Sequence, residues 1–199
     1  MVLQNEAKWL EEQIAAQCAP LLAGLKPSNL LIIPEGFEAW LKTSLKGTGF
    51  AAYCLSEYDG KQVYLVYKVS ELVVYLTEPE VQSLLMDLGY EGGELFTLLQ
   101  RVSKKYTAHK RKKSEFPHEL GLLLGYPAVD VRGFMEYEGK NFLYSGYWKV
   151  YGNVKETVSL FREFGRAKEF IGQLVKMGYS IADITAMYYK NKSYRLAVS

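Results

Sequence analysis

Residues 50–70, FAAYCLSEYDGKQVYLVYKVS, constrain the fold more than any other stretch of this 199-residue sequence. Two runs rich in aromatic and β-branched residues flank Asp59-Gly60, a pair that favours a tight type I′ turn because both of its residues tolerate positive φ. The pattern predicts strands over 50–58 and 61–69. Because an isolated hairpin is barely stable in water, the chain must build a larger sheet or helical cover around it.

The rest of the sequence alternates helical patterns with short strand patterns. NLLIIP predicts a buried strand over 29–33, and alternating aromatic residues predict a strand over 142–151 that is covered on both faces. A first helix is expected to be ended or kinked by Pro20, and long helices are expected over 154–176 and 181–189. We therefore predict an α+β fold, with a small, largely antiparallel sheet covered by several helices.

Length and composition are those of a single domain over residues 1–199. The chain is 49% apolar and 23% charged, close to the average of soluble proteins, which argues against disorder. Two cysteines, Cys18 and Cys54, cannot form a disulfide framework and lack zinc-ligand spacing, so we expect a cytoplasmic protein with no metal site. No uncharged run approaches the roughly 20 residues of a membrane helix, and the first residues lack an export-signal pattern, so no membrane association is expected.

Three predicted helices end on the same local signal. In each, a glycine is followed by tyrosine and then by a new helix: Gly89-Tyr90, Gly125-Tyr126 and Gly178-Tyr179. Glycine takes positive φ without a β-carbon clash, so the pattern predicts left-handed caps at these helix ends. The unequal spacing of the three glycines excludes a solenoid repeat.

The charges of the chain are unevenly distributed. Seven basic residues and no acidic residue lie between Arg101 and Lys113, so the remainder of the chain is net negative. A basic patch on an acidic body is typical of proteins that bind nucleic acids or anionic surfaces. Apolar residues at helical spacing just before and within this run favour a simpler interpretation, in which the lysines are solvated and complement the carbonyl end of a helix.

Residues 117–137 match the loose spacing of a DNA-reading helix-turn-helix. Gly121, Gly125 and Val131 stand where such a motif places a small residue, a turn glycine and an apolar residue. The second helix would carry Asp130 and further acidic residues, which phosphates repel. We therefore prefer a helical corner that serves folding, and nucleic-acid binding through 101–113 and 117–137 stays an alternative that the sequence disfavours.

Three blocks of the chain resemble the signature blocks of a bacterial family known as domain of unknown function 3793. The blocks are CAPLLAGLKPSNL at 18–30, FPHELGLLLGYPAVDVRGF at 116–134 and GYWKVYG at 146–152. The resemblance implies no particular activity. Members often carry a cysteine just before the GYWKVY block, where this chain has Ser145, which weakens any thiol or metal interpretation at that position.

A cysteine-dependent enzyme is a second alternative. Cys18 and His118 are the only candidates for a nucleophile and its base, and a thiol needs a lowered pKa to act as a nucleophile. Cys18 would face a positive helix end if the first helix stops before it, and a negative one if the helix runs through it. The sequence contains no glycine-rich phosphate loop that would indicate a cofactor.

The preferred interpretation is a module that binds a small ligand or a protein partner. Its 16 tyrosines and three tryptophans combine apolar area with a polar tip, which suits a binding cleft. The three blocks also contribute polar side chains among apolar ones, and we expect them to meet around a small anionic ligand. The candidate binding residues are Lys26, His118, Glu119, Tyr147, Lys149 and Tyr151.

Overall fold

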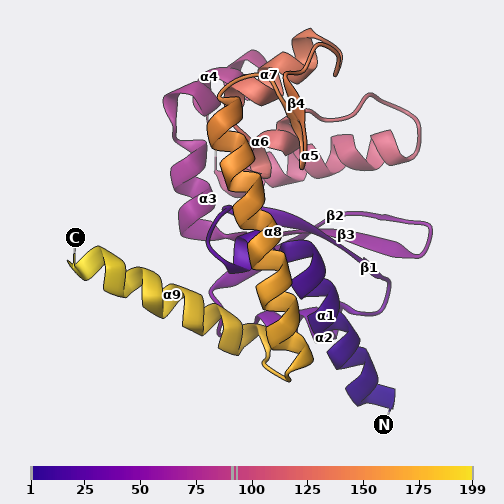
Figure 1. Cartoon of the computed structure of the whole chain (residues 1–199). Coiled ribbons are helices and arrows are strands. Elements are labelled where there is room, and N and C mark those ends of the chain that lie inside the picture. The colour runs from indigo at the N-terminus through magenta and orange to yellow at the C-terminus, as the bar shows by residue number, and fades with distance from the viewer. Residues whose placement is uncertain (1, 91, 93, 199) are drawn as a thin grey trace.

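A three-stranded antiparallel sheet lies between helices in this computed structural model (Figure 1). The structure describes residues 2–90, 92 and 94–198. The strands are β1 (Ser28–Pro34), β2 (Phe50–Tyr58) and β3 (Lys61–Lys68), and β3 lies in the middle in the order β1-β3-β2. The predicted α+β class and the three predicted strands of this sheet are confirmed.

The central strand β3 is buried on both faces. Val63 and Leu65 pack into an apolar cluster on one face of the sheet, whereas Tyr64 and Val66 pack into a separate cluster on the other face. This alternation explains why β3 reads as a nearly continuous apolar run, since a central strand needs apolar side chains on both sides. Asp59 and Gly60 have φ values of 50° and 68°, as the predicted turn requires.

A bulge in β2 links the sheet to α5 (Leu95–Lys110). The pairing register with β3 shifts between Cys54 and Ser56, so the Leu55 carbonyl leaves the strand ladder. Two hydroxyls of α5 donate to this carbonyl, from Ser103 at 2.8 Å and Thr107 at 3.2 Å. The buried carbonyl is therefore satisfied, and α5 is held across the sheet.

Two groups of helices cover the two faces of the sheet. One face carries α1 (Val2–Leu22), α2 (Glu38–Leu45), the last half of α8 (Val154–Lys176) and α9 (Ile181–Val198). The other carries α3 (Val69–Leu76), α4 (Pro79–Asp87), α5, α6 (Glu119–Leu123) and α7 (Ala128–Glu136). Among the helices of the described part, none is long and apolar enough to cross a membrane.

The long helix α8 connects the two ends of the molecule. In Figure 1 it runs from beside α7 down to α1 and α2. Phe161 and Phe164, in its first half, pack with Trp148 in a third apolar cluster, whereas Ile171 and Leu174 in its second half join the cluster of α1. One amphipathic helix therefore fixes the segment around Trp148 relative to the sheet.

The predicted strand over 142–151 is wrong. The segment forms a small separate hairpin instead, with β4 (Tyr144–Ser145) paired to β5 (Lys149–Val150). A turn interrupts it at Gly146, where any side chain would collide with the Phe161 ring. Its aromatic residues are not covered on both faces either, since Tyr144 and Tyr147 are 41% and 49% exposed. The alternation of aromatic residues in the sequence continues through the turn, so the sequence pattern does not reveal it.

Of the two effects expected of Pro20, an end or a kink of the first helix, the end is wrong, because α1 continues through Pro20 to Leu22. Proline removes one helical hydrogen bond, the one to the carbonyl of Ala16. Leu21 and Leu22 are fully buried, and their packing outweighs this loss.

The three predicted glycine caps are confirmed. Gly89, Gly125 and Gly178 have φ values of 81°, 71° and 94°. In each case the following tyrosine donates its backbone N–H to the carbonyl five residues earlier, at 2.9, 3.0 and 3.1 Å respectively. These bonds satisfy the last helical carbonyls, which have no partner within their own helix.

Candidate functional site

A pocket of about 440 Å³ opens between the α6–α7 corner, the β4–β5 hairpin and the end of α5. We call it the aromatic pocket. Its aromatic lining residues are Tyr106, Phe116, Tyr126, Phe134, Tyr147 and Trp148. All of its lining residues except Tyr106 and Ser145 belong to the three sequence blocks 18–30, 116–134 and 146–152. Segments that are far apart in the sequence therefore meet around one cavity.

The α6–α7 corner forms one wall because its two helices approach closely. A β-carbon at Gly121 would lie 2.9 Å from a methyl group of Val131, so glycine is needed there. Gly125 turns the chain at positive φ and also packs on Pro27, where a β-carbon would come within 2.6 Å. The residues that match the helix-turn-helix spacing thus shape the wall of the pocket.

A buried carboxylate joins the hairpin to α7. Asp130 is 2% exposed, and its oxygens accept hydrogen bonds from Trp148 Nε1 at 2.7 Å and from the backbone N–H groups of Tyr151 and Gly152 at 2.7 and 3.0 Å. Trp148 in turn stacks on Tyr126 with 4.5 Å between ring centroids. Because N–H donors occupy both of its oxygens, Asp130 is a structural clamp at the back of the pocket.

Three of the predicted binding residues, His118, Tyr147 and Lys149, line this pocket. Two of them lie against the Phe134 ring, with the His118 ring centroid at 5.6 Å and Lys149 Nζ at 5.7 Å from its centroid. Lys149 Nζ donates to the Gly139 carbonyl at 2.5 Å. None of the described acidic side chains pairs with Lys149. The pocket thus combines aromatic walls with a cation and an imidazole.

A second, smaller pocket of about 160 Å³ adjoins the first, and we call it the lysine pocket. It lies between α1, β1 and α8, and it shares the side chains of Leu30, Leu124, Tyr126 and Tyr147 with the aromatic pocket. The predicted binding residue Lys26 lines this pocket and not the aromatic one. Burial lowers the pKa of Lys26 to about 8, against a smaller opposing effect of Cys18.

Glu119 and Tyr151, two further predicted binding residues, line neither pocket. Glu119 is buried and accepts hydrogen bonds from Tyr90 and Lys105 instead. The Tyr151 ring covers Gly133 of α7, where a β-carbon would lie 2.5 Å away, and stacks on Tyr137. Within the described residues its hydroxyl is buried without a hydrogen-bond partner. Both side chains serve packing between elements.

Cys18 is not placed for catalysis. The helix α1 runs through it, its side chain is fully buried, and Sγ lies 3.8 Å from the Leu30 carbonyl. Burial raises the pKa of the Cys18 thiol to about 12, and the nearby Lys26 opposes this only weakly. A neutral buried thiol is a poor nucleophile, and His118 lines a pocket that Cys18 does not reach.

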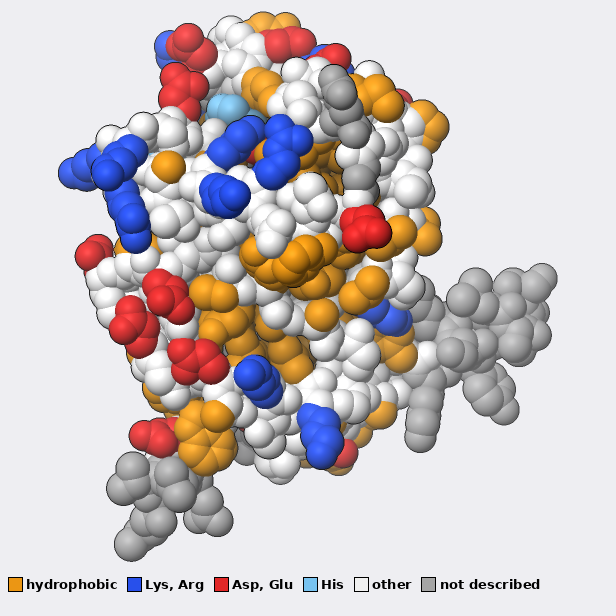
Figure 2. All heavy atoms as spheres, turned by 180° about the vertical axis from the view of Figure 1, so that it is seen from behind, with side chains coloured by type: hydrophobic (Ala, Val, Ile, Leu, Met, Phe, Trp, Pro, Cys, Tyr) orange, Lys and Arg blue, Asp and Glu red, His pale blue; other side chains and the backbone are white. Residues whose placement is uncertain are grey.

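Some residues of the surfaces considered for nucleic-acid binding take part in contacts within the fold. On α7, Arg132 pairs with Asp87, Asp130 is buried, and the 142–152 segment covers one side of the helix. In the basic run, Arg101 and Lys110 lie over the rings of Tyr90 and Tyr58 at 4.0 and 4.7 Å. Basic side chains also gather in the upper half of the rear face (Figure 2).

Sequence reasoning missed several residues of this site. Asp130, Phe134 and Trp148 stand inside the recognised blocks, but a buried carboxylate looks like any other helical Asp in a sequence. Lys168 of α8 also lines the lysine pocket, and it lies outside the blocks. Its only sequence signal is helical spacing from Phe164, which would place both on one face of α8.

Comparison with known proteins places the chain in one family. The family model described as "Protein of unknown function (DUF3793)" matches residues 14–185, so the chain belongs to this family, and the resemblance seen in the three blocks is confirmed. No curated protein and no solved structure matches the chain.

Proposed function

We propose that this chain is a binding protein for a small organic anion with a flat apolar body. The body would occupy the aromatic pocket, and the anionic group would be held by Lys149 and His118 at its wall. Two free cysteines, Cys18 and Cys54, fit a reducing compartment, and we place this function in the cytoplasm.

The convergence of the three sequence blocks on the aromatic pocket supports this proposal most. Aromatic rings offer an apolar surface for stacking, and a few fixed polar groups orient the ligand, which is the usual make-up of a small-molecule site. The carboxylate of Asp130 already accepts hydrogen bonds from three N–H donors, whereas Lys149 has a carbonyl and two rings as neighbours and no acid. An anionic ligand group would therefore supply the negative charge that Lys149 lacks.

A titration of Trp148 fluorescence tests the proposal. The variant Trp9→Phe, Trp40→Phe leaves Trp148 as the only tryptophan, because the chain has three. We expect 2-naphthoate to change its emission with a saturable curve, and the neutral analogue 2-naphthalenemethanol to bind at least tenfold more weakly. That difference corresponds to about 1.4 kcal/mol, near the lower end of a charge-assisted hydrogen bond.

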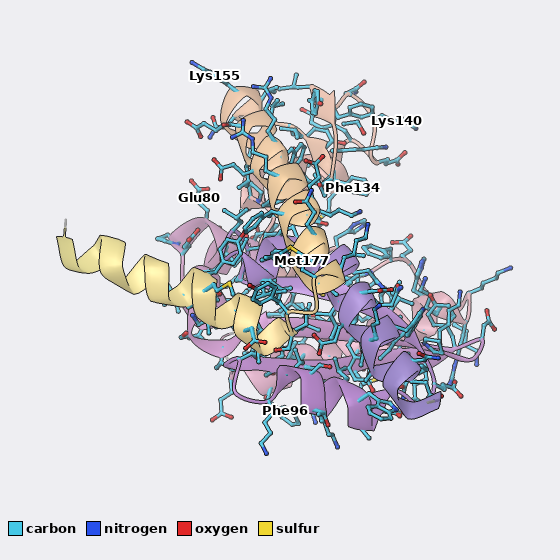
Figure 3. All side chains as sticks on the ribbon, turned by 60° about the horizontal axis from the view of Figure 1, so that its bottom comes forward. Glu80, Phe96, Phe134, Lys140, Lys155 and Met177 are labelled. Carbon is cyan, nitrogen blue, oxygen red and sulfur yellow. The ribbon has the colours of Figure 1, made fainter. Side chains whose placement is uncertain are left out.

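Matched variants assign the effect to the pocket. Lys149→Gln in the same background should weaken 2-naphthoate about tenfold and leave 2-naphthalenemethanol unchanged. The control is Lys155→Gln, an exposed lysine at the outer end of α8 (Figure 3). Equal affinity for the two ligands, or equal losses in the two lysine variants, would contradict the proposal.

A protein-interaction module is the second candidate, and the exposed side chains of the 142–147 segment favour it. Phe142, Leu143 and Tyr144 are 41%, 65% and 41% exposed, beside Phe134 at 36%. Contiguous exposed apolar side chains often mark a partner surface. Sedimentation velocity over a range of concentrations tests the case in which the partner is a second copy. Leu143→Ser should then reduce association, whereas Met177→Ser, at an exposed site on the end of α8, should not.

A further inference from the structure

The lysine pocket contains a buried cation that the described part of the fold leaves without a counter-charge. Lys26 is only 9% exposed, and its described pocket neighbours include a second cation, Lys168, but no Asp or Glu. None of the ion pairs of the described residues includes Lys26. Burying an ammonium group without an anionic partner is strongly unfavourable. The position therefore needs an explanation beyond packing.

The protein gives Lys26 only part of what an ammonium group needs. Nζ donates one hydrogen bond, to Asn29 Oδ1 at 3.2 Å, and lies 5.0 and 5.9 Å from the ring centroids of Tyr126 and Phe164. An ammonium has three N–H donors, so two have no acceptor among the described residues. Ring faces attract a cation, but less strongly than water or a carboxylate does.

The neighbours of Lys26 are themselves held in place. Asn29 donates from Nδ2 to the carbonyls of Gln17 and Leu30 at 2.5 and 3.1 Å, which fixes its Oδ1 as the acceptor for Lys26. The Tyr126 ring is fixed by its stack on Trp148. The ammonium is thus preorganised at the wall of the cavity, and an incoming ligand would not have to order it.

We propose that the lysine pocket is a binding subsite for an oxyanion, a carboxylate or phosphate group, held between Lys26 at its base and the exposed Lys168 at its rim. A cavity of about 160 Å³ accommodates such a group. The oxyanion would accept from the two unused N–H donors of Lys26 and supply the missing negative charge. The subsite itself does not depend on the proposed function.

The oxyanion has two sources that share this chemistry. It is either a free inorganic anion or the acidic end of the ligand in the aromatic pocket, which adjoins the lysine pocket at Leu124, Tyr126 and Tyr147. Only the second source rests on the proposed function. The aromatic dicarboxylate naphthalene-2,6-dicarboxylate probes it, with 2-naphthoate as its singly charged match.

Thermal unfolding with inorganic phosphate tests the subsite without the aromatic pocket. At pH 7 and constant ionic strength set with NaCl, phosphate should raise the Tm of the wild type by several degrees along a saturable curve. Lys26→Met should abolish this response and Lys168→Met should reduce it by half or more. Lys42→Met, at an exposed lysine of α2, should retain it. An equal response in wild type and Lys26→Met would overturn the proposal.

Titration of the wild type keeps the test valid if Lys26→Met fails to fold. The ¹³Cε signal of Lys26 reports its protonation, and bound phosphate should raise its pKa. The titratable groups around it are Cys18 on α1, Lys168 on α8, Tyr126 after α6 and Tyr147 in the hairpin. None of these groups is a carboxylate, so none of them supplies the negative charge that bound phosphate would bring. A Lys26 pKa that is unchanged by phosphate counts against the subsite.

The dicarboxylate distinguishes the two sources. If the oxyanion belongs to the ligand of the aromatic pocket, naphthalene-2,6-dicarboxylate should bind at least tenfold more tightly than 2-naphthoate in the Trp148 assay, and Lys26→Met should remove this advantage. A phosphate response without any naphthoate binding would leave the subsite standing and refute the proposed function. Naphthoate binding with no effect of phosphate on the Tm or on the Lys26 pKa would support the proposed function and refute the subsite.

Discussion

Glu119 and Lys26 are both buried charges, but the fold surrounds them differently. Glu119 is 2% exposed and accepts from Tyr90 Oη at 2.5 Å and from Lys105 Nζ at 2.7 Å. Burial alone would raise the pKa of Glu119, but the hydrogen bonds from Lys105 and Tyr90 outweigh it and the pKa is lowered. Lys26 has one amide oxygen and two rings, and burial lowers its pKa to about 8.

This difference separates a structural charge from a candidate binding charge. A buried ion with a complete set of partners stabilises one arrangement of the fold, whereas an incomplete set beside a cavity leaves interactions for a ligand. Between α5 and α6, Glu119 therefore has its full set of partners within the fold. At the junction of α1, β1 and α8, Lys26 does not.

Glu119→Ala should have the largest effect on stability. It removes the acceptor of the buried Tyr90 hydroxyl and the partner of Lys105, and it leaves a cavity, so we expect a loss of about 3 kcal/mol. Urea unfolding measures it, with Glu115→Ala at an exposed position as the control. A loss below about 1 kcal/mol would mean that Glu119 is not the closed structural charge described above.

Gly125→Ala should cost about 2 kcal/mol, because alanine is strained at a φ of 71° and its β-carbon would press on Pro27. The matched control is Gly89→Ala, which has a φ of 81° but no neighbour within 4 Å, and should cost about 1 kcal/mol. Since Pro27 follows Lys26, only the first variant should disturb the lysine pocket. Equal losses in urea unfolding would show that the contact with Pro27 is unimportant.

Lys26→Met should stabilise the protein by about 1 to 2 kcal/mol at pH 7. Methionine fills similar volume and removes the cost of burying the charge, which exceeds the lost hydrogen bond and ring contacts. The exposed Lys42→Met serves as the reference and should change the free energy of unfolding by less than about 0.5 kcal/mol. Destabilisation by Lys26→Met would mean that Lys26, like Glu119, is a buried charge that stabilises the fold.

The contribution of Lys26 to the pH dependence of stability should be the smallest effect. Between the folded pKa of Lys26, about 8, and its ordinary value of 10.5, the unfolded chain binds more protons, so stability rises with pH. From pH 7 to 9 the wild type should gain about 1 kcal/mol relative to Lys26→Met. Taking the difference in unfolding free energy between the two proteins cancels the contribution of the tyrosines, which also titrate at high pH. A flat difference would contradict a lowered Lys26 pKa.

The glutamate behaves in the opposite way at low pH. Because the pKa of Glu119 is lowered on folding, its stabilising effect is fully present above its ordinary value of 4.5 and is lost as the pH falls through the folded pKa. The difference between wild type and Glu119→Ala should therefore shrink in acid, where the difference for Lys26→Met stays constant.

Much of the fold could be predicted because its signals are local. The Asp59-Gly60 turn, the alternation in β3 and the three glycine caps each depend on a few consecutive residues and their own dihedral angles. The hairpin at 144–150 could not be predicted in the same way. At its turn, a β-carbon on Gly146 would collide with the Phe161 ring of α8, and nothing in the local pattern marks that contact.

The sequence by itself determined the α+β class, the strands of the main sheet and the polar residue types that three distant blocks contribute. Only the tertiary structure decided what those residues do. It paired Glu119 with Lys105 and Tyr90, buried the Cys18 side chain under α1, placed His118 and Lys149 in the lining of one pocket, and left Lys26 beside a cavity. The physical reason is that a charge acquires its role from partners distant in the sequence, whereas a turn or a strand is specified by its neighbours.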